Sequence, residues 1–246
     1  YLPIGVLIAY SFNESKSRAV FTGFTFDWYE RLFHNEVIIQ SLINTLIIAV
    51  VSSLIATIIG TAAAVGINSM NKWMKSAMMN LTYLPIINPE IVTGVSMMLL
   101  FVFLKLEFGF TTLIIAHITF GLPYVILNVL PKLRQMDNFV YEAALDLGCT
   151  PFLAFRKVIF PEILPGIISG MLMAFTFSLD DFVISYFTTG PTSQTLPVTI
   201  FSMTRRKVSP EINALSTIIF IVVLATLFIV NFKDLKKEKK VRREVS

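Results

Sequence analysis

The segment VIIQSLINTLIIAVVSSLIATIIGTAAAVGI, residues 37–67, contains no charged residue over its whole length. Its amide side chains, Gln40 and Asn44, both lie near its start. A helix needs about 20 predominantly apolar residues to cross the hydrocarbon core of a bilayer. The segment therefore predicts a transmembrane helix.

Further apolar stretches of similar length follow along the chain. They cover residues 76–104, 108–130, 162–187 and 212–232. The opening stretch, residues 1–10, is too short to cross a bilayer alone, so we expect the outer half of a first helix in a chain trimmed before Tyr1. These patterns predict an all-α membrane protein, a polytopic bundle of about six transmembrane helices forming a single domain over residues 1–246.

Composition agrees with a chain that faces lipid. Hydrophobic residues make up 55% of it, charged residues 15%, and its mean hydropathy is +0.73. The lone Cys149 excludes a disulfide within the chain, and His34 and His117 lack ligand spacing, so we expect no metal site. The chain also lacks a phosphate-binding loop and a hydrolase motif. We therefore expect no enzyme activity in the chain itself, and any energy input must come from a partner or from an ion gradient.

The distribution of Lys and Arg predicts the orientation of the chain. Seven lie in the connections on one side, and thirteen lie on the other. The second set occupies the connection at residues 72–75, the loop within residues 132–161 and the tail at residues 233–246. Because cytoplasmic connections carry the excess of positive charge, both termini and Cys149 are predicted to be cytoplasmic. The basic tail is expected to anchor the last helix against anionic lipid.

The predicted cytoplasmic loop has a recognisable local design. Residues 140–147 are good helix formers, and Gly148 permits a chain reversal that a Cβ would hinder. Thr150 and Pro151 then form a helix start signal, which predicts a second short helix over residues 152–160. Pro161 and Pro165 are expected in the opening turn of the next span. On this pattern alone, the loop is an amphipathic connector between two spans.

The spacing within this loop resembles the EAA loop of bacterial ABC-importer permeases, E-A-A-x3-G-x9-I-x-L-P. Glu142, Ala143, Ala144, Gly148 and Pro161 stand at the matching intervals, with Val158 for Ile and Phe160 for Leu. The resemblance implies the type I ABC importer permease fold in a bacterial inner (plasma) membrane, and a loop, residues 132–161, that couples to an ATPase. It also implies partners: an ATPase dimer that holds ATP and Mg, a second homologous permease and a periplasmic binding protein. This chain would hold no cofactor and bind no nucleic acid.

Other segments resemble the C-type permease subunit of spermidine/putrescine importers. They are YSFN at residues 10–13, FDWY at 26–29, SLDDFVI at 178–184, TGP at 189–191, TLP at 195–197 and VSPEINA at 208–214. The resemblance covers nearly the whole chain and implies polyamine cargo.

The acidic residues within the spans are the candidates for handling a cation. Asp180 and Asp181 lie about 27 Å from the start of their span at ~1.5 Å per residue. Intramembrane acids usually face a cavity or a partner, and because adjacent helical residues point about 100° apart, we expect only one of the two to line a path. Glu90 follows Asn88-Pro89, where the proline is expected to open the backbone. Trp28 is a candidate for cation–π contact with an amine or for the interfacial aromatic belt. The candidate substrate path thus comprises Asp180, Asp181, Glu90, Trp28 and Ser178.

Two other classes of function remain open from the residues alone. A gradient-driven secondary carrier would use Glu90 or Asp180 as a proton relay. A membrane scaffold would have no path at all. An ABC permease for another small solute is the alternative within the implied family, because a fold does not choose its cargo.

Overall fold

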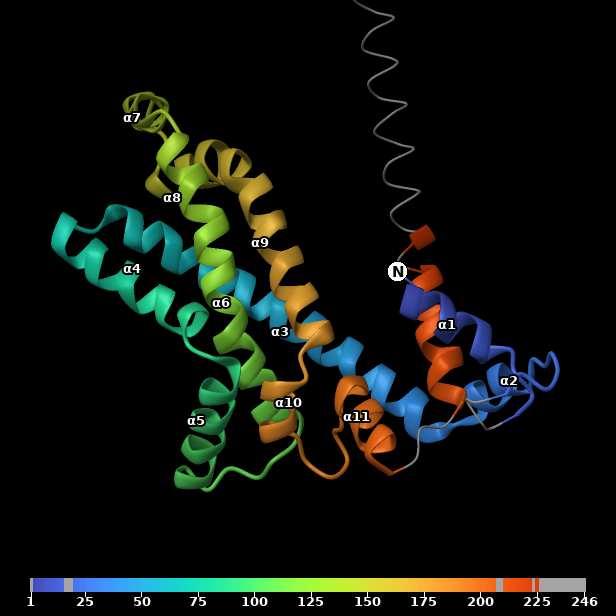
Figure 1. Cartoon of the computed structure of the whole chain (residues 1–246). Helices are drawn as coiled ribbons and strands as arrows, with labels where there is room; N and C mark the ends of the chain where they lie inside the picture. Colours follow the sequence, from blue (N-terminus) through green and yellow to red (C-terminus); the bar gives the residue numbers. More distant parts are fainter. Residues whose placement is uncertain (1, 16–19, 207–209, 223, 226–246) are drawn as a thin grey trace, which may run out of the picture. The chain divides into compact units, whose positions relative to one another are not determined.

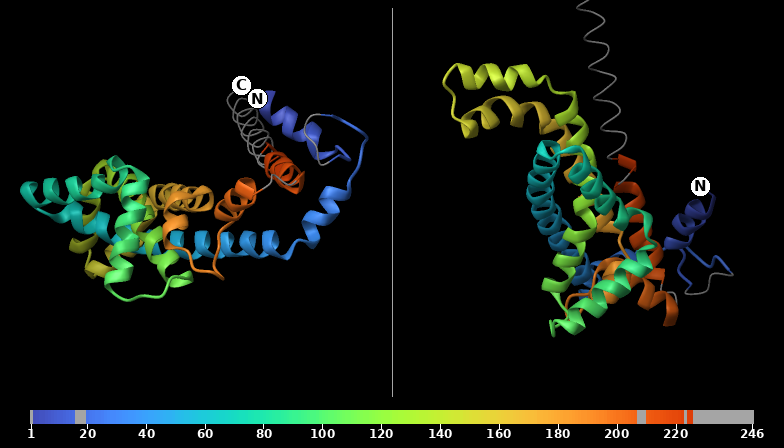
Figure 2. Two further views of the ribbon diagram at one scale, coloured as in Figure 1. Left: turned by 60° about the horizontal axis from the view of Figure 1, so that its bottom comes forward. Right: turned by 90° about the vertical axis from the view of Figure 1, so that its left-hand side faces the viewer.

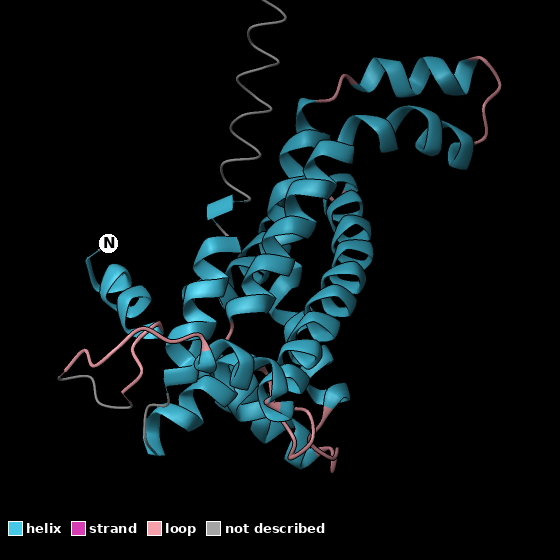
Figure 3. Ribbon diagram, turned by 90° about the vertical axis from the view of Figure 1, so that its right-hand side faces the viewer, coloured by secondary structure: helices cyan, strands magenta, loops and turns pink. Residues whose placement is uncertain are grey.

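The computed structural model describes residues 2–15, 20–206, 210–222 and 224–225, and every regular element in these ranges is a helix (Figures 1 and 3). They fall into two compact units, which are described separately: Gln40–Thr199, and the described parts of Tyr1–Ile39 and Ile200–Ser246. The basic tail, the end of the last predicted span and part of the 208–214 motif lie outside the described residues. The helices are α1 (Leu2–Ser11), α2 (Asp27–His34), α3 (Glu36–Ser69), α4 (Lys72–Ile87), α5 (Glu90–Phe103), α6 (Phe110–Gln135), α7 (Asn138–Asp146), α8 (Pro151–Ala154), η1 (Phe155–Ile159), α9 (Phe160–Asp180), α10 (Val183–Thr188), α11 (Leu196–Arg206) and the helix Pro210–Val222.

The predicted spans have helical counterparts. Three helical stretches are long and apolar enough to cross a membrane: Glu36–Ser69, Phe110–Gln135 and Pro151–Asp180. Helices α4 and α5 pass the same test as a bent pair, and two shorter apolar helices, Leu2–Ser11 and Pro210–Val222, match the first and last predictions. The all-α membrane fold predicted from the sequence is confirmed.

The second predicted full-length span is sharply bent. Helices α4 and α5 meet at 104°, with Asn88 and Pro89 in extended conformation between them. A proline lacks the N–H that a continuing helix needs and disfavours helical geometry in the residue before it. The expected opening of the backbone at Asn88-Pro89 is therefore present, and it places Glu90 at the first position of α5.

Helices α6 and α9 form the centre of the Gln40–Thr199 unit and pack side by side (Figures 1 and 2). Gly166, Gly170, Ala174 and Ser178 recur every four residues on α9 and are buried. A Cβ at Gly170 would lie 2.9 Å from Val125 Cα, and one at Gly166 would lie 2.7 Å from the Asn128 carbonyl oxygen. Small residues at this spacing let two helix backbones approach closely in a membrane. We call this contact the α6–α9 seam.

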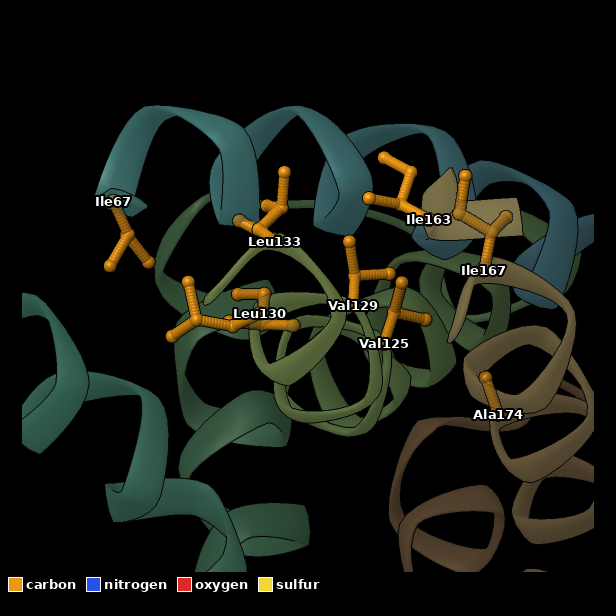
Figure 4. Packing of buried hydrophobic residues seen from close by; sticks show 10 residues of the cluster. Ile67, Val125, Val129, Leu130, Leu133, Ile163, Ile167 and Ala174 are labelled. Atoms are coloured by element: carbon orange, nitrogen blue, oxygen red, sulfur yellow. The ribbon is translucent and has the colours of Figure 1, made fainter. Parts of the chain in front are cut away.

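Large aliphatic side chains flank the seam. Figure 4 shows those of α6 and α9 gathered against α3, and they form the main apolar cluster of this unit. Its buried members are Ala64, Ile67, Val125, Ile126, Val129, Leu130, Leu133, Ile163, Ile167 and Ala174. The close backbone approach and the surrounding aliphatic packing together hold α6 and α9 as one rigid pair.

The fourth predicted span is wrong at both ends. The sequence predicted one helix over residues 162–187, but α9 ends at Asp180 and α10 begins at Val183. Asp181 is extended, and its carboxylate accepts the backbone N–H groups of Ile184 and Ser185, a local bond that competes with the helix. At the other end, α8, η1 and α9 follow one another without interruption, so Pro161 lies inside a continuous helical stretch. A π-turn precedes it, in which Phe160 N–H donates to the Phe155 carbonyl, and Pro161 has no N–H to place.

Helices α7 and α8 form a hairpin before α9 (Figure 2, right). Gly148 has a φ of +86°, a left-handed conformation that residues with a Cβ adopt at a penalty. The Thr150 side chain accepts the Leu153 N–H and begins α8. The reversal predicted at Gly148 and the helix start predicted at Thr150 are confirmed.

Candidate functional site

The two neighbouring acids of the candidate path have different surroundings. Asp180, the last residue of α9, is exposed. Asp181 is only 8% exposed, and its carboxylate caps the first turn of α10. One of the pair is therefore exposed, and the other organises the backbone.

A buried polar group lies behind this pair. His117 of α6, 4% exposed, places Nδ1 2.6 Å from Ser178 Oγ and Nε2 3.1 Å from Ser185 Oγ. The same Nε2 lies 3.6 Å from Asp181 Oδ2. Ser178 Oγ is also 3.3 Å from Ser52 Oγ on α3. We call Ser52, His117, Ser178, Asp181 and Ser185 the histidine cluster, which ties α3, α6, α9 and α10 together.

Two aromatic side chains lie near Glu90 and Asp180. The Glu90 carboxylate is exposed and lies within electrostatic range of the Tyr124 hydroxyl. The Tyr124 and Phe177 rings are half-buried, with centroids 4.4 Å apart. Phe177 precedes Asp180 by three residues on α9, which places both on one side of the helix. Glu90, Tyr124, Phe177 and Asp180 form the acidic–aromatic row, in which two carboxylates flank two aromatic rings; both kinds of group accept contacts from an ammonium group.

Ser178 and Trp28 are interior residues. The Ser178 hydroxyl belongs to the histidine cluster. Trp28 is 4% exposed, and its indole N–H donates to the Asn13 carbonyl at 2.6 Å. The guanidinium of Arg31 lies over its ring, 5.2 Å from the centroid. Neither side chain is open to a solute in this arrangement, so their direct contact with cargo stays a prediction.

Trp28 instead organises the loop between α1 and α2. Its bond to Asn13 joins two of the segments that carry the family resemblance, residues 10–13 and 26–29. Ser11 Oγ and Tyr29 Oη are 2.7 Å apart, and the Phe12 ring stacks on Phe24 with centroids 5.1 Å apart. This pairing was not predictable from the sequence, because it depends on contacts across the loop.

The loop after α10 is fastened to α3. Asn44 Nδ2 donates to the carbonyls of Thr192 and Gln194, at 3.4 and 3.1 Å. The Thr45 hydroxyl accepts the Leu196 N–H at 2.8 Å. The motif segments at residues 189–191 and 195–197 therefore shape a loop whose conformation depends on α3.

The hairpin formed by α7 and α8 presents the residues of the EAA spacing. Glu142 and Ala143 are exposed, Ala144 is half-buried, and Gly148 and Pro161 are exposed. Large apolar side chains accompany them: Leu147 is 87% exposed, and Phe139 and Phe152 are each 76% exposed. An exposed apolar patch of this kind marks a surface that contacts another molecule.

The groups of the acidic–aromatic row are of a kind that binds cations. Among the described residues, no three His, Cys, Asp or Glu side chains are grouped to hold a metal ion. Carboxylates and aromatic rings along the row can accept hydrogen bonds and cation–π contacts from a cation.

These features agree with the class of protein that the comparison of sequences gives. Residues 56–242 match the family described as the binding-protein-dependent transport system inner membrane component. The chain belongs to this family, as a membrane-embedded permease subunit of a transport system.

Named relatives match nearly the whole chain or all of it. It is 39% identical over 225 residues to the spermidine/putrescine transport system permease protein PotC of Haemophilus influenzae, covering 92% of this chain and 88% of that protein. It is 38% identical over 252 residues to the putrescine transport system permease protein PotI of Escherichia coli K12, covering 100% and 90%.

Solved structures share the fold. A bacterial ABC transporter involved in the import of the acidic polysaccharide alginate matches with a TM-score of 0.72 at 18% identity, covering 94% of this chain and 87% of that chain. The MetNI methionine ABC transporter, in inward-facing conformations, matches with a TM-score of 0.61 at 19% identity, covering 80% and 92%. The fold expected from the EAA spacing, that of an ABC importer permease, is confirmed.

Proposed function

We propose that this chain is one of two membrane subunits of an ATP-driven importer that carries polyamines, spermidine or putrescine, across the bacterial inner membrane. The observation that carries the proposal is the acidic–aromatic row in a permease of this family. Two relatives named for spermidine and putrescine transport support the cargo.

The α7–α8 hairpin is the coupling element in this proposal. Glu142, Ala143 and Ala144 would form the face that docks in a groove of an ATPase subunit, Gly148 would turn the chain, and Pro161 would lie where the hairpin enters α9. The exposed apolar side chains of the hairpin support such a contact. ATP and Mg would be held by an ATPase dimer, and its closure would move the hairpin and open the path. A second homologous permease would complete the pore, and a periplasmic binding protein would deliver the cargo.

The acidic–aromatic row supports a cationic cargo. The fold does not choose one, since the two solved transporters are named for an acidic polysaccharide and an amino acid. A polyamine carries spaced ammonium groups that no single carboxylate satisfies. Asp180 and Glu90 would serve as successive acceptors, with Tyr124 and Phe177 between them. Asp181 and Ser178 would act from behind the path by holding its walls, and Trp28 would hold the loop between α1 and α2.

Reconstitution tests the cargo and the role of Asp180. The complete importer in vesicles, with its ATPase, second permease and binding protein, should take up spermidine or putrescine only with ATP. Asp180→Asn should lower uptake roughly tenfold or more, because a hydrogen bond to a charged group contributes about 1.5–3 kcal/mol. Glu107→Gln is the matched control, since Glu107 is an exposed carboxylate between α5 and α6, outside the row. Equal uptake by both variants would contradict the proposed cation path.

Cys149 tests the orientation. It is the only cysteine of the chain and is partly accessible beside the turn of the hairpin. A membrane-impermeant thiol reagent should label Cys149 from the cytoplasmic side. Both termini should lie on the same side. Labelling from the periplasm alone would place the hairpin beyond reach of an ATPase. Uptake by this chain alone, driven by a proton gradient, would instead identify a secondary carrier.

A further inference from the structure

His117 links both sides of the break between α9 and α10. Through Nδ1 it meets Ser178, which precedes the break, and through Nε2 it meets Ser185, which follows it. A neutral imidazole donates from one ring nitrogen and accepts at the other, and a serine hydroxyl can take either role. Both nitrogens are therefore satisfied by residues that lie on opposite sides of Asp180.

The break itself determines where Asp180 stands. Asp181 leaves the helix because its carboxylate bonds the N–H groups of Ile184 and Ser185. That carboxylate is buried, and the nearest basic ring is His117, with Nε2 3.6 Å from Oδ2. These two N–H groups satisfy the buried carboxylate, and the polar His117 ring beside it offsets part of the cost of burying a charge. His117 thus supports the interaction that ends α9 at Asp180.

His117 lies on α6, which is packed tightly against α9, so its own position is fixed relative to the break. The α6–α9 seam runs from Gly166 to Ser178, so its last contact is the Ser178–His117 bond. Beyond that bond the chain leaves α9 and packs as α10 against α5 and α6. No other histidine lies among the described residues of this unit.

We propose that His117 is a positioning residue for cargo passage: it holds the α9–α10 break through Ser178, Ser185 and Asp181, and thereby keeps the Asp180 carboxylate exposed in the acidic–aromatic row. Its importance for transport depends on the proposed function, whereas its control of the exposure of position 180 does not. His117 itself is buried and does not touch the cargo.

Thiol accessibility at position 180 tests the positioning without any cargo. Asp180→Cys in a Cys149→Ser background leaves one thiol, whose labelling rate by a hydrophilic, positively charged reagent reports its exposure in the assembled importer. Adding His117→Ala should change that rate several-fold. Adding Thr119→Ala should leave it unchanged, because Thr119 is exposed on the same helix and its hydroxyl bonds only the Ile115 carbonyl. An unchanged rate in the His117→Ala protein would overturn the proposal.

Two conservative variants separate positioning from simple packing between α6 and α9. The amide of glutamine can reach the place of Nε2, towards Ser185 and Asp181, whereas that of asparagine reaches only the place of Nδ1, towards Ser178. His117→Gln should therefore restore the labelling rate and spermidine uptake better than His117→Asn. Equal restoration by both would reduce His117 to a packing residue of the seam.

Ser185→Ala keeps the test independent of folding, since it removes a single hydroxyl from the cluster and keeps the backbone cap of Asp181. It should shift the labelling rate at position 180 in the same direction as His117→Ala. No shift would count against the proposal. If labelling depends on His117 but the wild-type importer takes up no polyamine, the positioning stands and the proposed cargo fails.

Discussion

Replacing Gly170 by alanine tests the close packing of α6 against α9. The new Cβ would lie 2.9 Å from Val125 Cα and 3.3 Å from the Val125 carbonyl oxygen. Ordinary van der Waals contact begins at 3.4 Å, so the first of these approaches is about 0.5 Å too short. Both opposing atoms belong to the backbone and cannot rotate away. The two helices must separate along the seam, and overpacking of this kind typically destabilises a protein by about 1–3 kcal/mol.

Gly66→Ala is the matched control. Gly66 also lies inside a long helix, α3, but a Cβ there would meet nothing within 4 Å. Alanine is the better helix former by about 0.5–1 kcal/mol, so this variant should be as stable as the wild type or more stable. Thermal unfolding of both purified variants in the same detergent, followed by circular dichroism, measures the difference. If Gly170→Ala unfolds at the temperature of Gly66→Ala, the helices do not meet as closely as described.

Two further substitutions test the hairpin and the loop after α10. A Cβ at Gly148 would meet nothing within 4 Å, so only the φ of +86° opposes a side chain, at about 1–2 kcal/mol. Gly148→Asn should therefore retain more ATP-driven uptake than Gly148→Val at equal membrane abundance. Equal loss of uptake in both variants would indicate that the turn conformation is irrelevant. Asn44→Ala leaves the Thr192 and Gln194 carbonyls without their donor and should destabilise the protein by about 1–3 kcal/mol. Gln40→Ala, which removes only an exposed donor to Asn44, should have a smaller effect in the same unfolding assay.

The spans were predictable because the bilayer imposes a length on apolar segments. The segment at residues 37–67 became α3, Glu36–Ser69, within two residues at each end. The bend at Asn88-Pro89 and the turn at Gly148 were equally predictable from the sequence, because proline and glycine act through their own backbones. The start of α8 needed only the side chain of Thr150.

The break at Asp181 could not be predicted in the same way. Its cap is local, but the ring that faces the buried carboxylate comes from His117, and the nearby Ser178 bond joins residues 61 positions apart. Aspartate is a favoured cap, so a second acid late in a span was a signal that a new helix could begin there. The contacts of Trp28 were hidden for a related reason: its type suits a cation, and only the structure shows Asn13 at its polar edge and Arg31 over its face. At both Asp181 and Trp28, the surroundings of the side chain depend on its partners and not on the residue type alone.

In the proposed function, the seam and the continuous helix would connect the ATPase contact to the cargo contact within one chain. From Pro151 to Asp180 the chain is helical over 30 residues, or about 45 Å at ~1.5 Å per residue. The hairpin lies at one end of this stretch, and the exposed carboxylate of Asp180 lies at the other. Because close contacts with α6 leave α9 no room to slide or twist independently, a displacement of the hairpin must move the α6–α9 pair as a unit. The joint at Asp181, held by His117, is then the first place along this stretch where the two sides can change their relative direction.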